Sequence, residues 1–170
     1  TDAAGISQQI GAANPLERVA LALTQQAAGL RPIAFHAVSL FVHLCATSAL
    51  FLLAKRLTQR VDLALVAAAI FGLHPVHAES VARISALHTP LAALCIFLAL
   101  YVHAGNGRES FDWKQHGLSA ALFVSGLLAD ETALAFLPMA LVIDLLAKRP
   151  GTRRIRFTTR LSMISLSRPR

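Results

Sequence analysis

Charged residues are scarce in this chain, at 15% of 170 residues, whereas a soluble domain has roughly 25%. Aromatic residues make up only 6%, too few for the aromatic girdles of a membrane β-barrel. The two cysteines, Cys45 and Cys95, lie inside apolar segments and are expected to be buried free thiols, so a disulfide framework is excluded. These shortages leave a helical protein rich in apolar segments as the main class.

Long apolar blocks dominate what is present. Hydrophobic residues make up 55% of the chain, and the mean hydropathy is +0.58. We expect spans at about 33–54, 61–73 and 84–102, with Pro90 kinking the third. The block 116–147 is either one very long helix or two spans that meet at Asp130 and Glu131. The predicted fold is all-α: a polytopic membrane protein with about five transmembrane helices.

The distribution of positive charge decides between these two interpretations of the last block. Cytoplasmic flanks of membrane spans carry an excess of Lys and Arg. With five spans, 13 basic residues lie inside and only Arg18, Arg31 and Arg83 lie outside. A single last span would place the basic tail outside. The rule therefore predicts an outer N-terminus and an inner C-terminus.

The chain divides into three parts under this prediction. Residues 1–32 form an extracytoplasmic loop or amphipathic segment, with a short helix at 16–26 that Asn14 caps and Gly29 ends. Residues 33–148 form the transmembrane helical bundle, and residues 149–170 form a basic cytoplasmic tail. Because the chain starts at Thr1 without a signal peptide, we expect it to be a piece of a longer protein.

The net charge of +7 does not indicate nucleic-acid binding. Six of the basic residues, from Lys148 to Arg160, follow the last apolar block, where membrane proteins carry them, and no aromatic stacking platform lies among them. The bilayer, not nucleic acid, is the expected partner.

Polar groups gather where several spans would reach the outer side. The densest run is FGLHPVHAESV at 71–81, which places His74, His77 and Glu79 between two apolar segments. Such groups at the end of a membrane span are functional-site hypotheses. Other segments bring polar groups to the same leaflet: His36, Ser39, His43 and Thr47 on one face of the first span, His88 one turn into the third, and Asp130 with Glu131 at the last junction.

Simpler roles stay open for each of these residues. His36 and His43 can hydrogen-bond between helices, and Asp130 can cap the last span. A divalent metal on His74, His77 and Glu79 is a further alternative, although their spacing matches no zinc signature. Haem ligation is another: His36, His43 and His88 are its candidate ligands.

Four motifs, in order along the chain, resemble a known family. They are Arg31-Pro32 followed by HAVSLFVH at 36–43, FGLHPVHAESV at 71–81, ISALHTPLAAL at 84–94 and GLLADETAL at 126–134. Together they resemble the TMTC-like group of GT-C membrane glycosyltransferases, O-mannosyltransferases that carry tetratricopeptide repeats at their C-terminus. The resemblance covers residues 29–148 and implies a partial GT-C-like bundle.

The resemblance implies transfer of a sugar, mannose, from a polyprenyl-phosphate carrier to Ser/Thr hydroxyls of a protein acceptor. It places the site on the extracytoplasmic side of the bacterial inner membrane or the ER membrane. No certain cofactor is implied, and the family's acidic pair is expected before Thr1. The implied residues are Glu79, His77 and His74 for catalysis, and Arg83, His36, His43 and Glu131 for substrate binding.

The main alternative is a non-enzymatic membrane module, such as a transporter fragment or a structural subunit. A transporter brings polar groups toward the bilayer midplane from both sides. Here they gather at one leaflet, which favours the transferase.

Overall fold

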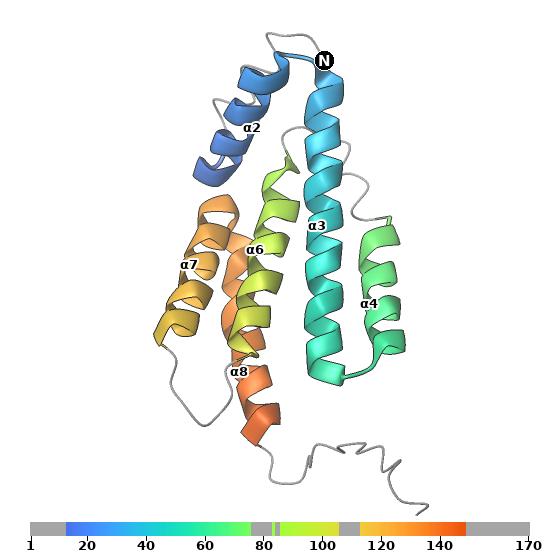
Figure 1. The fold of residues 1–170 in the computed structure, drawn as a ribbon. Coiled ribbons are helices and arrows are strands. Elements are labelled where there is room, and N and C mark those ends of the chain that lie inside the picture. Colours follow the sequence, from blue (N-terminus) through green and yellow to red (C-terminus); the bar gives the residue numbers. More distant parts are fainter. Residues whose placement is uncertain (1–12, 76–82, 84–85, 106–112, 149–170) are drawn as a thin grey trace, which may run out of the picture.

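The computed structural model describes residues 13–75, 83, 86–105 and 113–148, and this part of the chain is helical throughout (Figure 1). Its elements are α2 (Pro15–Ala28), α3 (Pro32–Thr58), α4 (Val61–Leu73), α6 (His88–His103), α7 (Trp113–Ala129), the 3₁₀ helix η2 (Glu131–Ala135) and α8 (Phe136–Lys148). The all-α prediction is confirmed.

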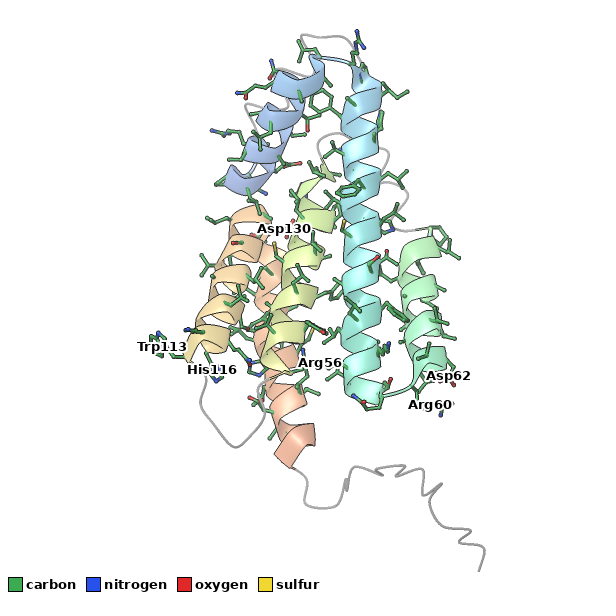
Figure 2. All side chains as sticks on the ribbon, in the orientation of Figure 1. Arg56, Arg60, Asp62, Trp113, His116 and Asp130 are labelled. Carbon is green, nitrogen blue, oxygen red and sulfur yellow. The ribbon has the colours of Figure 1, made fainter. Side chains whose placement is uncertain are left out.

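Successive long helices run in alternating directions, and α3 packs antiparallel to α4, as α6 does to α7 (Figure 1). We call the end that holds α2, the start of α6 and the α7–η2 junction the upper end. The lower end holds the turn between α3 and α4 and the start of α7. Figure 2 shows Asp130 just below α2, level with the middle of α3, and well above Arg60 and Asp62 at the lower end.

Several helix boundaries follow from local sequence. Pro15 stands in the first turn of α2, and Gly29 follows its end with a φ of 67°, which costs glycine little. The predicted second span, 61–73, coincides with α4. Asp130 separates α7 from η2 and accepts a hydrogen bond from the backbone N–H of Thr132 at 2.7 Å. The block 116–147 is therefore not one very long helix, because it breaks at Asp130 into α7, η2 and α8.

The third predicted span needs two corrections. Its helix, α6, begins at His88, and Pro90 lies in the first turn. Backbone N–H groups of the first turn make no hydrogen bond within the helix, so proline, which lacks this N–H, removes none there. The predicted Pro90 kink is therefore wrong. His88 is the first residue of α6, not a residue one turn inside it.

Two apolar clusters hold the helices together. The upper cluster contains Leu21, Phe35 and Leu87, from α2, α3 and the residue before α6. The larger cluster, lower in the bundle, centres on α6 and includes Leu53, Ile96, Ala99, Leu100, Ala133, Phe136 and Ala140. Ser119 of α7 donates to the carbonyl oxygen of Ala99 at 3.0 Å and ties α7 to α6.

Many large apolar side chains lie exposed on the outer faces. They include Leu40, Phe41 and Leu44 on α3, Val66 and Ile70 on α4, and Leu137 and Leu141 on α8. Among the described helices, only α3 is long and apolar enough to cross a membrane, with a mean hydropathy of 2.1 over its best window; α4 and α6 are shorter apolar helices. Five spans are not confirmed by these lengths.

The crossing of α6, α7 and η2 predicts a steric test. A Cβ atom at Gly126 would lie 3.2 Å from the Cβ of Ala133 and 3.3 Å from the Cβ of Cys95, so a larger side chain cannot enter without moving a helix. Gly126→Leu should lower the free energy of unfolding by about 1–3 kcal/mol.

The matched control is Gly117→Leu, because a Cβ at Gly117 meets nothing within 4 Å and the residue is exposed in α7. This control should be neutral or stabilising by about 0.5–1 kcal/mol, since glycine disfavours helix. Thermal unfolding of both variants measures the difference, and equal midpoints would contradict the packing described.

Candidate functional site

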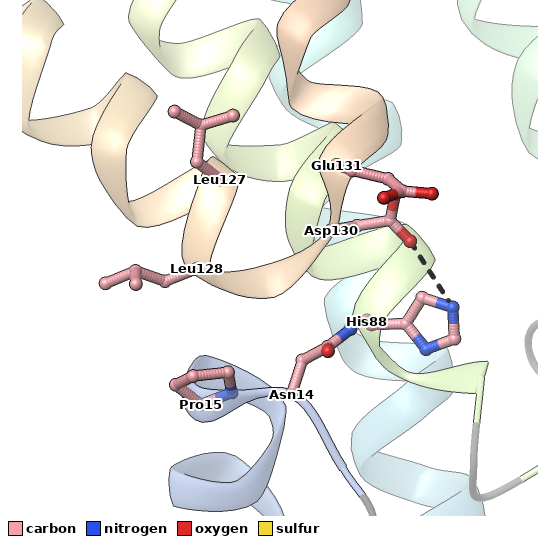
Figure 3. Close-up of a pocket in the computed structure, with 7 residues that line it drawn as sticks. All are labelled: Asn14, Pro15, His88, Leu127, Leu128, Asp130 and Glu131. Atoms are coloured by element: carbon pink, nitrogen blue, oxygen red, sulfur yellow. Dashed lines mark ion pairs between the residues drawn. The ribbon is translucent and has the colours of Figure 1, made fainter.

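A pocket of about 510 Å³ lies at the upper end, between the start of α2 and the α7–η2 junction (Figure 3). Its lining residues are Asn14, Pro15, His88, Leu127, Leu128, Asp130 and Glu131. They come from three segments that are far apart in sequence, so the pocket exists only when α2, α6 and α7 are packed together. Its described lining contains two carboxylates and an imidazole.

His88 sits between two carboxylates. Its Nδ1 lies 3.5 Å from Oε2 of Glu17, and its Nε2 lies 3.4 Å from Oδ2 of Asp130 (Figure 3 shows the second contact). The backbone N–H of His88 also donates to Oε1 of Glu17 at 3.2 Å. We call Glu17, His88 and Asp130 the upper clamp, because they join α2, α6 and the α7–η2 junction.

Glu17 is placed in the clamp by the local chemistry of two helix starts. It lies in the first turn of α2, where the helix dipole favours a carboxylate. His88 starts α6, and its backbone N–H is one of the donors that a helix start leaves without a helical acceptor. The Glu17 side chain is only 2% exposed, so a buried carboxylate satisfies a partly buried donor.

Asn14 adds a second tie between α2 and α7. It stands at the predicted N-cap position of α2 but makes no side-chain cap hydrogen bond. Its Nδ2 instead donates to the carbonyl oxygen of Ala129, the last residue of α7, at 2.8 Å. The contact satisfies an acceptor that the end of α7 leaves open.

A carboxylate–imidazole–carboxylate arrangement can accept, hold and pass a proton. Such groups serve as general acids and bases when a substrate lies within hydrogen-bond reach. The two ring nitrogens face different carboxylates, and the described residues contain no cluster of three His, Cys, Asp or Glu that could hold a metal.

The residues predicted for catalysis are only partly described. His74 follows the end of α4 and is exposed. His77 and Glu79 lie outside the described residues, so their roles stay predictions. Of the residues predicted to bind substrate, Glu131 lines the pocket and Arg83 is exposed.

The predicted polar stripe of α3 faces protein. Ser39 and His43 are buried, while His36 and Thr47 are half-buried. The imidazole Nε2–H of His43 donates to the carbonyl oxygen of Gly72 at 3.2 Å, and the ring stacks on Phe71 with centroids 5.5 Å apart. The hydrogen-bonding role between helices, one alternative for His43, is thus present between α3 and α4.

The lower end has its own polar contacts, of a different kind. Nε2 of His103 lies 3.1 Å from Oδ1 of Asp144, whose side chain is 54% exposed. Arg60 and Asp62 form an ion pair, and both groups are exposed. Exposed pairs of this kind contribute little to stability.

Glu17 and Asn14 were missed as site residues by sequence reasoning. Both lie at the start of a predicted helix, and a role in starting that helix already accounted for them. The sequence did offer one signal for Glu17: carboxylates are rare in this chain, which has nine Asp and Glu residues in total. Nothing in the sequence shows that Glu17 meets His88, which is 71 positions away.

The described residues therefore form a set of helices with exposed apolar faces and a pocket lined by two carboxylates and an imidazole. Comparison with curated proteins points to one group. The chain is 30% identical over 81% of its length to "Protein O-mannosyl-transferase Tmtc1" of Drosophila melanogaster and 32% identical over 72% to "Protein O-mannosyl-transferase Tmtc2" of the same organism. It is 30% identical over 69% to "Protein O-mannosyl-transferase TMTC1" of Homo sapiens.

This chain is TMTC-like, which confirms the resemblance inferred from its motifs. The matched region covers only 14–16% of the length of these relatives. No family model matches the chain, and no solved structure matches it.

The buried clamp predicts a measurable difference between two carboxylates. Glu17→Gln keeps the shape but weakens the acceptor for the His88 N–H and removes the negative charge beside the ring. We expect the free energy of unfolding to fall by about 1–3 kcal/mol, with faster amide hydrogen exchange in α2.

Asp144→Asn is the matched control, since it makes the same change beside His103 at an exposed position. It should alter stability by less than about 0.5 kcal/mol. If Glu17→Gln is as mild as Asp144→Asn and leaves exchange in α2 unchanged, the clamp does not hold α2.

Proposed function

We propose that this chain is part of an integral membrane glycosyltransferase that moves mannose from a polyprenyl-phosphate carrier to Ser/Thr hydroxyls of proteins. The observation that carries the proposal is the similarity to relatives named protein O-mannosyl-transferases. The aligned stretch is 69–81% of the chain, and the upper pocket draws its lining from α2, α6 and the α7–η2 junction.

Exposed apolar side chains support placement in a bilayer. Only 33% of the most apolar window of α3 is buried inside the protein, whereas a core helix of a soluble protein is mostly buried. Exposed leucines and valines on α3, α4 and α8 add to this outer surface. In water these faces would be unfavourable, and in lipid they are solvated.

Charge supports one orientation. At the lower end the described basic residues include Lys55, Arg56 and Arg60 near the end of α3 and Lys114 near the start of α7. The positive-inside rule then puts the lower end in the cytoplasm and the upper end outside. The pocket thus faces the side where the transfer is proposed. The 13 residues of α4 and of α8 span only ~20 Å each, which requires a locally thinner bilayer or support from neighbouring helices.

The chemistry assigns roles to the predicted residues. The acceptor hydroxyl oxygen bonds to the anomeric carbon of mannose, the bond from that carbon to the carrier phosphate breaks, and the hydroxyl proton passes to a base. Glu79, with His74 and His77, is proposed to supply the base. Arg83 is proposed to bind the departing phosphate, with His36, His43 and Glu131 supporting the substrates.

The activity is tested in the full-length parent protein that contains this segment, in membranes from cells that lack it. The assay supplies polyprenyl-phosphate mannose and a Ser/Thr peptide, and counts mannose joined to the peptide. Transfer that depends on the parent is expected. No transfer from this donor, with the protein expressed and folded, would contradict the proposal.

Glu79→Gln in the same parent should reduce transfer by roughly 10²–10⁴-fold, the contribution of a general base, without lowering expression. Asp144→Asn, at the lower end, is the control and should leave transfer unchanged. Wild-type activity in the Glu79→Gln variant would show that Glu79 is not the base.

The orientation is tested with single cysteines in a parent whose other cysteines, Cys45 and Cys95 among them, are replaced by alanine. Exposed positions at opposite ends are suitable: Glu131→Cys at the upper end and Gln59→Cys at the lower end. In vesicles with the extracytoplasmic face outward, an impermeant maleimide should label Glu131→Cys alone. Labelling of Gln59→Cys alone would reverse the proposed orientation.

A further inference from the structure

We propose that the upper pocket binds a hydroxyl-bearing group that carries no negative charge, and that it excludes phosphate. This inference rests on the proposed function and deepens it, because it assigns one part of the substrates to this pocket. It makes the pocket a site for sugar hydroxyls or for the acceptor hydroxyl, and it places the carrier phosphate elsewhere.

The charge of the lining is the first reason. Asp130 and Glu131 both line the pocket, and the described lining residues include no Lys or Arg. Figure 3 shows the two carboxylates beside His88. A phosphate there would lie beside two carboxylates in a partly buried site, where repulsion is screened less than in water. Among the described lining residues, His88 could carry a positive charge, and its ring already lies between Glu17 and Asp130.

The hydrogen-bonding character of the lining is the second reason. Asp130 keeps a fixed orientation because its Oδ1 accepts from the N–H of Thr132 while its Oδ2 faces His88. Asn14 donates one amide N–H to Ala129, which orients the amide; its carbonyl oxygen remains as an acceptor beside the second N–H. Carboxylate and amide oxygens accept hydrogen bonds, so the complementary ligand is a donor such as a hydroxyl.

The apolar wall and the size of the pocket fit the same ligand. Pro15, Leu127 and Leu128 line the pocket beside the polar groups. A sugar ring has C–H faces as well as hydroxyls, and threonine has a methyl group beside its hydroxyl. The volume of about 510 Å³ lies in the range of roughly 300–1,000 Å³ typical of small-ligand sites.

The experiment measures binding, not transfer, and uses the full-length parent in lipid nanodiscs. Three probes are compared by saturation-transfer NMR: methyl α-mannoside, a short uncharged Ser/Thr peptide, and inorganic phosphate as a competitor. Three variants accompany the wild type: Glu131→Gln, Glu131→Lys, and Asp144→Lys as a control at the lower end. Glu131 is exposed, so its substitution should not prevent folding.

At least one uncharged probe should bind the wild type, and phosphate should not displace it. Glu131→Gln should weaken that probe about tenfold, the loss expected for one charge-assisted hydrogen bond. Glu131→Lys should let phosphate compete, and Asp144→Lys should change nothing. The probe that loses affinity identifies the source: mannoside assigns the pocket to the donor sugar, and peptide assigns it to the acceptor.

Three results would overturn the inference: phosphate competing in the wild type, no binding of either uncharged probe, or unchanged binding in both Glu131 variants. The proposed function fails separately. If the parent transfers no mannose but a probe binds in a way that depends on Glu131, the transferase is rejected and the hydroxyl site is kept. If the parent transfers mannose but binding does not depend on Glu131, the hydroxyl site is rejected and the transferase is kept.

Discussion

The carboxylate of Glu17 joins parts of the chain that local structure alone would leave apart. It is buried in the first turn of α2, accepts the first backbone N–H of α6 and faces the ring of His88, which in turn faces Asp130. A buried carboxylate is tolerated only where hydrogen bonds and a cationic partner offset its lost hydration. The clamp therefore fixes α2 over the pocket and determines the shape of the upper end.

The rest of the bundle follows a different constraint. Apolar side chains between α3, α6 and α8 form the larger core, and small residues such as Gly126 and Ala133 let helices approach closely. The outer faces stay apolar, which suits lipid and not water. Polar chemistry is thus concentrated where helices end, and the upper end holds buried carboxylate–imidazole contacts while the lower end holds exposed pairs.

Local signals predicted the elements better than the site. The apolar run 61–73 and the break at Asp130 appeared as expected, because length, hydropathy and a capping residue act within one or two turns. The start of α6 was placed too early, since Pro90 was interpreted as an internal kink and not as a first-turn residue. The contact of Glu17 with His88 was not predictable, because no local rule says which distant helix start a buried acid will satisfy.

The most direct test of the clamp is a mutant cycle between two residues that both contact His88. The free energy of unfolding of the parent is measured for Glu17→Gln, Asp130→Asn and the double variant, with and without His88→Ala. A shared imidazole predicts a coupling energy of about 0.5–3 kcal/mol that falls to near zero when His88 is alanine. Additive effects with His88 present would contradict the clamp as the interaction that organises the upper end.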